Sequence, residues 1–241
     1  MKQVHFVLQG KGGVGKSYIA SLLKQHFTSR NIKTRGIDTD PVNATFASYK
    51  SFEVERLEIM VGDNVDPRAF DTLIEWIMTS DDDSIFIVDN GAATFVPLCA
   101  YLFENSVISF LQDNNCKVTL HSVLTGGQAL NDTTHGLRNL FTHFPDVSVC
   151  VWINEFFGKP EKNGKSFEQS NFYKNHTDQV HGILRIAEIR KETFGADIDH
   201  MLREKLSFAE AIESSNFNIM AKQRLKMVWH ELNTQLNLLQ F

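Results

Sequence analysis

Long hydrophobic runs, paired cysteines and an excess of positive charge are all missing from this sequence of 241 residues. No apolar stretch approaches the roughly 20 residues that a membrane-spanning helix needs. The chain begins with a strand-like segment rather than a signal peptide. Its net charge of −5 argues against nonspecific DNA binding by the surface as a whole. We therefore expect a soluble, cytoplasmic protein.

Cysteine is also scarce. Only Cys99, Cys116 and Cys150 are present, in apolar surroundings and without paired spacing, which is typical of reduced thiols in a protein interior. The hydrophobic content of 42% and charged content of 22% are close to those of an average folded domain. No repeat, low-complexity tract or linker divides the chain. We expect one α/β domain over residues 1–241, with a C-terminal helical segment, from about 193 onward, packed on it.

A phosphate-binding loop lies near the start of the chain. Gly10, Gly15, Lys16 and Ser17 match the spacing G-x-x-x-x-G-K-[ST]. The apolar run VHFVL precedes the loop and the helix-like segment SYIASLLKQHF follows it, which is the context that the motif requires. Glycines let backbone N–H groups approach phosphate oxygens, Lys16 reaches the β- and γ-phosphates, and the Ser17 hydroxyl ligates Mg²⁺. The sequence therefore predicts a site for a nucleoside triphosphate and Mg²⁺.

Strand-like and helix-like segments alternate along the rest of the chain. Further strands are predicted at 33–38, 84–90, 117–125, 147–154 and 181–189, helices at 67–80, 126–144 and from the last strand to the end, and a surface loop at 157–169. This alternation predicts a doubly wound α/β fold, with one mostly parallel sheet and helices on both faces. Gly126, Gly127 and Gln128 open the helix at 126–144, either as a tight junction or as a functional surface.

Acidic side chains stand at the ends of two predicted strands. Asp38 is the last residue of the strand at 33–38, and Asp40 follows it. Asp89 lies at the end of the strand at 84–90. In parallel sheets, ligands bind at the carboxyl ends of the strands. One carboxylate suits Mg²⁺, partly through water, and another suits the positioning or deprotonation of attacking water. An ordinary Asp-rich turn is the alternative for Asp38 and Asp40; their combination with the loop and Asp89 favours catalysis.

Two of these segments resemble motifs of a known family. Lys11–Ser17, KGGVGKS, resembles the deviant Walker A signature K-G-G-x-G-K-[ST] of ParA/MinD ATPases, and DTDPVNAT resembles their D-x-D-P-x-G-N-A-T switch, one residue shorter. The order of predicted elements matches over most of the chain. The phrases VLQGKGGVGKS, IDTDPVNATF, TGGQAL and GKSFEQ are similar to the plasmid-encoded TraL/StbB-type group, which is associated with conjugative transfer and plasmid stability.

The resemblance implies an ATP- and Mg²⁺-dependent homodimer that works with a plasmid-encoded partner protein. Lys11 would reach across the dimer to the partner's nucleotide, whereas Asp40 would position the hydrolytic water. The implied catalytic residues are Lys11, Lys16 and Asp40; the nucleotide-binding residues are Gly10, Lys11, Gly12, Gly13, Val14, Gly15, Lys16, Ser17, Tyr18, Asn154, Ile186, Ala187 and Glu188; and the metal-site residues are Ser17, Asp38 and Asp89. Asn154 would read the adenine edge, beside a wall formed by 186–188.

The sequence departs from the family pattern at two positions. After Asp89 many relatives have Thr-Pro-Pro or a similar turn, whereas this chain has Asn90-Gly91-Ala92-Ala93. A different response of this second switch to the γ-phosphate is therefore expected. Ala187 stands where many relatives have a proline beside the adenine, which weakens the case for the adenine wall.

The C-terminal segment from 222 to 241 has two interpretations. Leu225, Trp229, Leu232, Leu236 and Leu239 share one helical face, with Lys222, Arg224 and Lys226 near its start. This composition suits a helix packed on the sheet, and it also suits a membrane-gripping amphipathic helix. The basic residues are few and the last turns carry none, so the packed helix is favoured. DNA association through a partner, at the nucleoid, stays open.

Three functions are compatible with these features. The preferred one is a dimerising ATPase switch in plasmid transfer, stability or positioning. A second is an adaptor that holds ATP without turnover and recruits a partner to DNA or membrane; the presence of Lys11 and Asp40 favours turnover. The third is a redox relative that bridges an iron–sulfur cluster through Cys99 and Cys116, which lack the expected flanking glycines.

Overall fold

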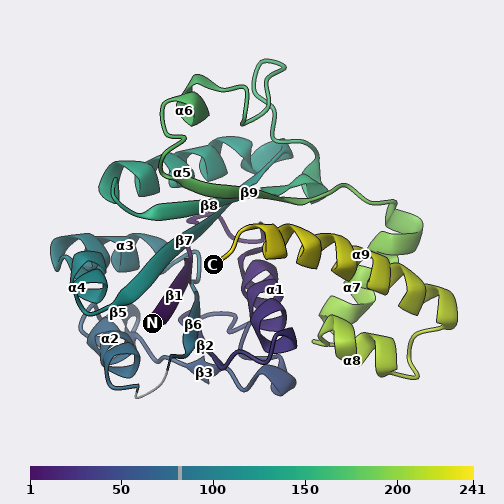
Figure 1. Cartoon of the computed structure of the whole chain (residues 1–241), viewed down its shortest axis with the longest axis horizontal. Coiled ribbons are helices and arrows are strands. Elements are labelled where there is room, and N and C mark those ends of the chain that lie inside the picture. Colours follow the sequence, from purple (N-terminus) through teal and green to yellow (C-terminus); the bar gives the residue numbers. More distant parts are fainter. Residues whose placement is uncertain (81–82) are drawn as a thin grey trace.

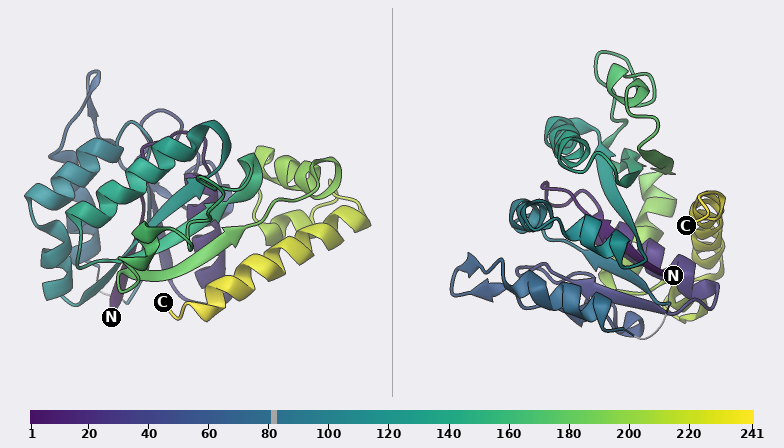
Figure 2. Two further views of the ribbon diagram at one scale, coloured as in Figure 1. Left: turned by 90° about the horizontal axis from the view of Figure 1, so that it is seen from above. Right: turned by 60° about the vertical axis from the view of Figure 1, so that its left-hand side comes forward.

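The computed structural model describes residues 1–80 and 83–241. Its main element is a seven-stranded sheet in the order β3-β2-β6-β1-β7-β8-β9, and all neighbouring strands in it run parallel. The strands are β1 (Lys2–Val7), β2 (Thr34–Asp38), β3 (Glu55–Arg56), β6 (Ile85–Asp89), β7 (Cys116–Thr125), β8 (Ser148–Asn154) and β9 (Val180–Ile186). A separate hairpin of β4 (Met60–Val61) and β5 (Asn64–Val65) projects from the body (Figure 2).

Helices cover both faces of this sheet, so the predicted fold class is confirmed. They are α1 (Lys16–Ser29), α2 (Ala69–Met78), α3 (Phe95–Glu104), α4 (Val107–Asp113), α5 (Leu130–His143), α6 (Asn171–Lys174), α7 (Ala196–Arg203), α8 (Phe208–Glu213) and α9 (Ile219–Leu238). Helices α2, α3, α4 and α5 pack on one face, and α1, α7, α8 and α9 pack on the other (Figures 1 and 2).

Strand β6 illustrates why the central strands are apolar along their whole length. Phe86 and Val88 join the core beneath α2–α5, while Ile85 and Ile87 join the core beneath α1. Successive side chains of a strand point to opposite faces, so a strand covered on both sides needs apolar residues at every position. Strand β6 is buried throughout, and this leaves Asp89, at its end, in an apolar environment.

The strand order brings the predicted site residues to one edge. The chain crosses from β6, on one side of β1, to β7 on the other side, and such a reversal opens a crevice at the carboxyl ends of the strands. The register aligns Val7 with Asp89, and Asp89 with Asp38. The loop that follows β1 therefore begins beside Asp89, and Asp38 lies one strand further along the same edge.

The C-terminal helix packs on the protein itself. Leu225, Leu232 and Leu236 of α9 are buried against the α1 face of the sheet. The Gln235 side chain accepts from the backbone N–H of Arg185 at 2.7 Å and donates to its carbonyl at 3.0 Å, so it occupies the free edge of β9. The predicted apolar face of this segment is thus turned toward α1 and β9, as the packed-helix interpretation expects.

Hydropathy gives little support for a membrane-spanning segment. Among the described residues, no single helix is long and apolar enough to cross a bilayer. Helices α3 and α4 have sufficient length and hydropathy only when taken together, and the chain bends by 57° between them.

Several boundaries and elements differ from the sequence-based expectation. The helix expected at 126–144 begins at Leu130, after a 3₁₀ turn at Gly127–Ala129, and the strand expected at 181–189 ends at Ile186. Gly126 packs so closely that an added Cβ would lie 2.4 Å from the Gly158 carbonyl oxygen, and Gly127 has a φ of +64°. This stretch is therefore the tight junction, and Gln128 is exposed. Strands β3–β5 and helices α3 and α4 were not predicted.

Candidate nucleotide-binding site

The predicted phosphate loop connects β1 to α1. Gly13 and Gly15 have φ angles of +73° and +105°, which side chains disfavour, and Gly15 directly precedes the first turn of α1. The Asn154 side chain, at the end of β8, donates to the Val14 carbonyl at 3.0 Å. The loop is thereby fastened to a second strand. Its backbone N–H groups lie at a helix N-terminus, the arrangement that binds phosphate.

Lys16 lies inside this loop. Its side chain is buried and its Nζ donates to the Lys11 carbonyl at 3.0 Å. Burial lowers the pKa of Lys16, whereas the nearby carboxylates of Asp89 and Asp40 raise it. The ammonium group thus stands between the loop and the acidic strand ends.

Asp89 is the most perturbed carboxyl group of the site. Burial raises its pKa to about 7, while a hydrogen bond from Ser17 and the charge of Lys16 act in the opposite direction. Its Oδ1 is buried without any hydrogen-bond partner. A buried, unpartnered carboxylate oxygen beside a serine hydroxyl offers oxygen ligands of the kind that Mg²⁺ takes. The site therefore fits a magnesium ion bound together with a phosphate chain.

Asp38 also stabilises the backbone of the segment that follows β2. Its Oδ1 accepts from the Asp40 N–H and its Oδ2 from the Ala47 N–H, each at 2.9 Å. Burial raises the pKa of Asp38, whereas these two backbone hydrogen bonds lower it. Asp38 thus holds the segment 40–47 in a defined turn next to Asp89.

Asp40 caps its own turn in this conformation. Its Oδ1 accepts from the N–H groups of Val42, at 2.9 Å, and Asn43, at 3.2 Å, which is the arrangement that the Asp-rich-turn alternative predicts. The same carboxyl group lies against the second strand end, because a Cβ added to Gly91 would lie 2.8 Å from the Asp40 Cγ. The segments that follow β2 and β6 are therefore in contact through this side chain.

Lys11 points away from Lys16, toward α5. Its Nζ forms a 2.8 Å ion pair with Oδ2 of Asp132, in the first turn of that helix. Both side chains remain about half exposed. The first lysine of the signature is thus accessible at the rim of the site and paired within its own subunit.

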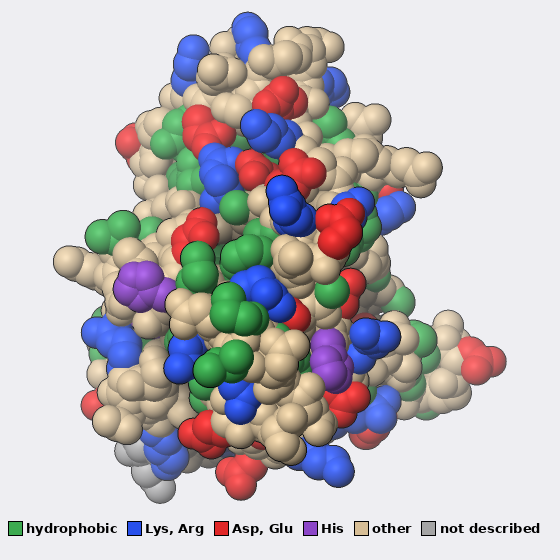
Figure 3. All heavy atoms as spheres, turned by 90° about the vertical axis from the view of Figure 1, so that its right-hand side faces the viewer, with side chains coloured by type: hydrophobic (Ala, Val, Ile, Leu, Met, Phe, Trp, Pro, Cys, Tyr) green, Lys and Arg blue, Asp and Glu red, His purple; other side chains and the backbone are tan. Residues whose placement is uncertain are grey.

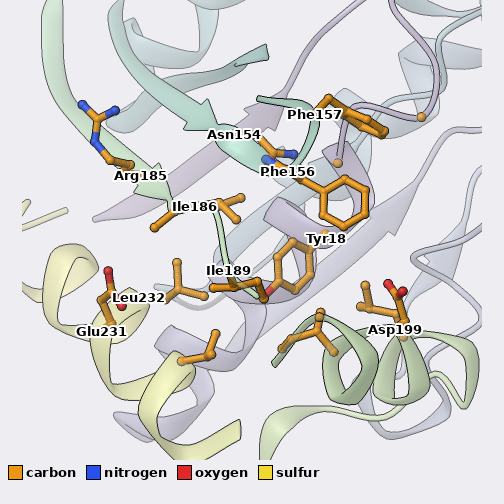
Figure 4. A pocket seen from close by; sticks show the side chains of 17 residues that line it. Tyr18, Asn154, Phe156, Phe157, Arg185, Ile186, Ile189, Asp199, Glu231 and Leu232 are labelled. Atoms are coloured by element: carbon orange, nitrogen blue, oxygen red, sulfur yellow. The ribbon is translucent and has the colours of Figure 1, made fainter. Parts of the chain in front are cut away.

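A pocket of about 270 Å³ adjoins the loop (Figure 4). Four of the residues implied to bind the nucleotide, Tyr18, Asn154, Ile186 and Ala187, line this pocket; Glu188 is outside the lining, and its N–H donates to Glu155 at 3.3 Å. The lining residues that sequence reasoning missed include Phe156, Phe157, Ile189, Ile198, Leu202 and Leu232. They come from η3 (Glu155–Phe157), the segment after β9, α7 and α9, and no local motif marks them.

The cysteines contribute little to any site. Burial raises the pKa of the Cys99 thiol to about 12 and also raises that of Cys116. Since the thiolate is the metal-binding form, these surroundings oppose cluster ligation. Within the described residues, no group of three or more His, Cys, Asp or Glu side chains is arranged to hold a metal. A magnesium ion held by one or two carboxylates together with phosphate oxygens needs no such group.

Comparisons with known proteins agree with this geometry. The chain is 45% identical over 238 residues to "Protein TraL" of Escherichia coli, covering 98% of both chains. Its fold is similar to MinD in the MinC:MinD cell division protein complex of Aquifex aeolicus (TM-score 0.51, 13% identity, 95% of both chains). MinD of the same organism alone gives a TM-score of 0.50 at 15% identity, covering 95% of this chain and 96% of that one.

The family model for the CobQ/CobB/MinD/ParA nucleotide binding domain matches residues 5–238, which include the phosphate loop, both acidic strand ends and α9. This span, together with the nearly full-length relative, establishes that the chain belongs to the CobQ/CobB/MinD/ParA family of nucleotide-binding proteins.

Proposed function

We propose that this protein binds ATP with Mg²⁺ and hydrolyses it as a nucleotide-dependent dimer. The observation that carries the proposal is Asp89: a buried carboxyl group beside the Ser17 hydroxyl and close to Lys16, with one oxygen unpartnered. Such a group, at the mouth of a phosphate loop, suits a site that is completed by a metal ion and a phosphate chain. When bound, the magnesium ion supplies charge neutralisation across the phosphates.

The chain's own residues have distinct tasks in this proposal. The loop N–H groups and Lys16 hold the phosphates, Ser17 and Asp89 hold the metal with Asp38 nearby, and Asp40 orients and deprotonates the attacking water. The turn hydrogen bonds from Val42 and Asn43 use Oδ1 of Asp40, which leaves Oδ2 to accept the proton of the attacking water. The contact of this carboxyl group with Gly91 provides a route by which the segment after β6 influences its position.

Lys11 supplies the dependence on dimerisation. It is half exposed at the rim of the site, so a second subunit placed over the loop would offer it a phosphate chain in place of Asp132. A cation aimed at the phosphates stabilises charge that shifts during phosphoryl transfer. In this way association and hydrolysis depend on the same contact.

The biological setting follows from the relatives. Nearly full-length identity of 45% to Protein TraL, with the resemblance to plasmid conjugation and stability proteins, supports a cytoplasmic role in plasmid transfer, stability or positioning. We further propose that the whole chain acts as one domain and that hydrolysis is slow until a plasmid-encoded partner binds.

Phosphate release from ATP tests the proposal against the non-hydrolytic adaptor. Wild type should release phosphate with Mg²⁺, whereas Asp40→Ala should keep its ATP affinity and lose turnover by about 10²–10⁴-fold. Lys16→Ala should weaken ATP binding, because a charge-assisted phosphate contact contributes roughly 1.5–3 kcal/mol. Tight ATP binding by wild type with no release above the Asp40→Ala level would favour the adaptor, and unchanged affinity in Lys16→Ala would remove the loop from the site.

A further inference from the structure

A second pocket lies between α5 and the 160–172 segment, and it shares no lining residue with the pocket at Asn154. Its volume is about 240 Å³. The apolar part of its lining consists of Leu124, Leu130, Leu137, Pro160, Phe167 and Phe172, and neutral polar side chains such as Thr134 and Ser170 complete it. Arg138, Lys162 and Lys165 also line it, and the lining contains no Asp or Glu. Basic side chains are visible at the upper end of the molecule, near this segment (Figure 3).

A tight hairpin holds two of these cations side by side. The backbone N–H of Lys162 donates to the Lys165 carbonyl at 3.0 Å, and the N–H of Lys165 donates back at 3.1 Å. Asn163 and Gly164 between them have φ angles of +53° and +71°, as a two-residue hairpin turn requires. Like charges directly opposite each other across a strand pair are destabilising. The hairpin therefore maintains an unfavourable pair of charges that a bound anion would relieve.

The rest of the segment keeps this hairpin in place. Phe167 is buried in the core beneath α5, and Glu168 forms a 2.5 Å ion pair with Arg185 of β9. The phrase GKSFEQ, prominent in the sequence, thus anchors the hairpin on both sides. Since the backbone of the hairpin is fixed before any ligand arrives, binding loses little backbone entropy.

Arg138 is positioned by an aromatic ring. Its guanidinium lies over the ring of Phe172, with Cζ 5.5 Å from the centroid. Phe141 and His176 also pack against this ring, at centroid distances of 5.2 and 4.4 Å. Among the described residues, Arg138, Lys162 and Lys165 have no ion pair with Asp or Glu. Three cations thus line a partly apolar pocket in a chain of net charge −5.

We propose that this pocket binds an acidic peptide segment of a partner protein, which inserts an apolar side chain between α5 and the hairpin. Carboxylates match the free guanidinium and ammonium groups, and the Leu and Phe lining matches an aliphatic or aromatic anchor. A nucleic acid strand fits less well, because bases bind such proteins by stacking and the ring of Phe172 is already covered. Inorganic phosphate would leave the apolar lining unused.

Selection of a phage-displayed library of short random peptides on the full chain tests this proposal. Enriched peptides should carry acidic residues close to Leu, Ile or Phe. By fluorescence anisotropy, the double variant Lys162→Glu/Lys165→Glu should bind a selected peptide at least tenfold more weakly. Lys174→Glu, two residues beyond this segment and outside the pocket lining, should bind it like wild type. Oligothymidylate and inorganic phosphate should not compete with the peptide at low concentration.

Four results would contradict this proposal. The proposal is wrong if no peptide is enriched, if the enriched peptides lack acidic residues, if both variants bind equally, or if oligothymidylate competes at least as well as unlabelled peptide. ATP affinity is measured in the same variants and should be unchanged, because the pocket lies apart from the loop. Loss of peptide binding with intact ATP binding separates this inference from the proposed function, which can fail independently.

Discussion

Lys11 and Asp132 form a 2.8 Å ion pair that joins the phosphate loop to the first turn of α5. In the proposed dimer the same ammonium group meets the partner's nucleotide, so the ion pair and the trans contact compete for one cation. An exposed ion pair contributes only about 0–1 kcal/mol, and a contact with a phosphate chain contributes more. The pair therefore holds Lys11 in place without preventing its transfer.

Replacing Lys11 tests the trans contact. Lys11→Ala should keep most of its ATP affinity, because Lys16 and the backbone N–H groups still hold the phosphates. Dimerisation with a non-hydrolysable ATP analogue, measured by sedimentation, should be lost together with hydrolysis. A mixture of Lys11→Ala with Asp40→Ala should recover part of the hydrolysis, since one site then has both groups. Wild-type dimerisation by Lys11→Ala would show that this lysine acts only within its own subunit.

Replacing Asp132 should have the opposite effect. Asp132→Asn releases Lys11 and should strengthen ATP-dependent dimerisation by up to about fivefold, the equivalent of an exposed ion pair. The substitution also removes a favourable acidic group from the first turn of α5, at a cost of about 0.3–1 kcal/mol in stability. Sedimentation and thermal unfolding separate the two effects. Weaker dimerisation at unchanged stability would mean that Asp132 belongs to the dimer contact itself.

Two core histidines predict acid sensitivity. Trp152 Nε1 donates to His121 Nδ1 at 3.1 Å, so the proton of neutral His121 is on Nε2, which lies 2.9 Å from His5 Nδ1. Burial lowers the pKa of His5 to about 3 and that of His121 well below its usual value. Their folded-state pKa values are below the unfolded value of about 6.5, so stability is complete above that pH and falls as the pH decreases toward 3.

Relative to pH 7, the share of His5 in the loss at pH 5 should be about 2 kcal/mol, and His121 adds a loss in the same direction. The raised pKa of Asp89 acts in the opposite direction, because this carboxyl group takes up a proton more readily in the folded than in the unfolded protein. His5→Gln can still accept the hydrogen bond from His121 but does not titrate, so urea unfolding at pH 7 and pH 5 should show a loss about 2 kcal/mol smaller than in wild type. An equal loss in the variant and in wild type would place the acid-sensitive group elsewhere.

Helix α9 offers a matched pair of substitutions. Leu236 is 1% exposed and Leu238 is 77% exposed on the same helix. Leu236→Ala should lower the free energy of unfolding by about 2–5 kcal/mol, whereas Leu238→Ala should change it by less than about 0.5 kcal/mol. Binding to anionic vesicles should be absent in wild type. Vesicle binding that Leu238→Ala abolishes would instead support the membrane-gripping interpretation.

Elements with a strong local pattern were predictable from the sequence. The loop around Lys16 was recognised from the spacing of its glycines. Strand β6 was predicted from an unbroken apolar run, which is typical of a strand that is buried on both faces. Short β3–β5 lack a period long enough to detect, and α3–α4 break at Asn105 and Ser106, where Ser106 has a φ of +50°. Local patterns alone do not define such pieces.

The sequence by itself determined the phosphate-loop motif, the order along the chain of the six longer strands β1, β2, β6, β7, β8 and β9, and the acidic residues at two strand ends, because each depends on neighbouring residues. Only the tertiary structure decided what lies beside them. Asp132 beside Lys11, Phe156 beside Tyr18, and Arg138 near Lys165 come from segments far apart in the chain. Their proximity depends on how helices pack over a twisted sheet, and the packing energy is spread over many apolar contacts that leave no motif in the sequence.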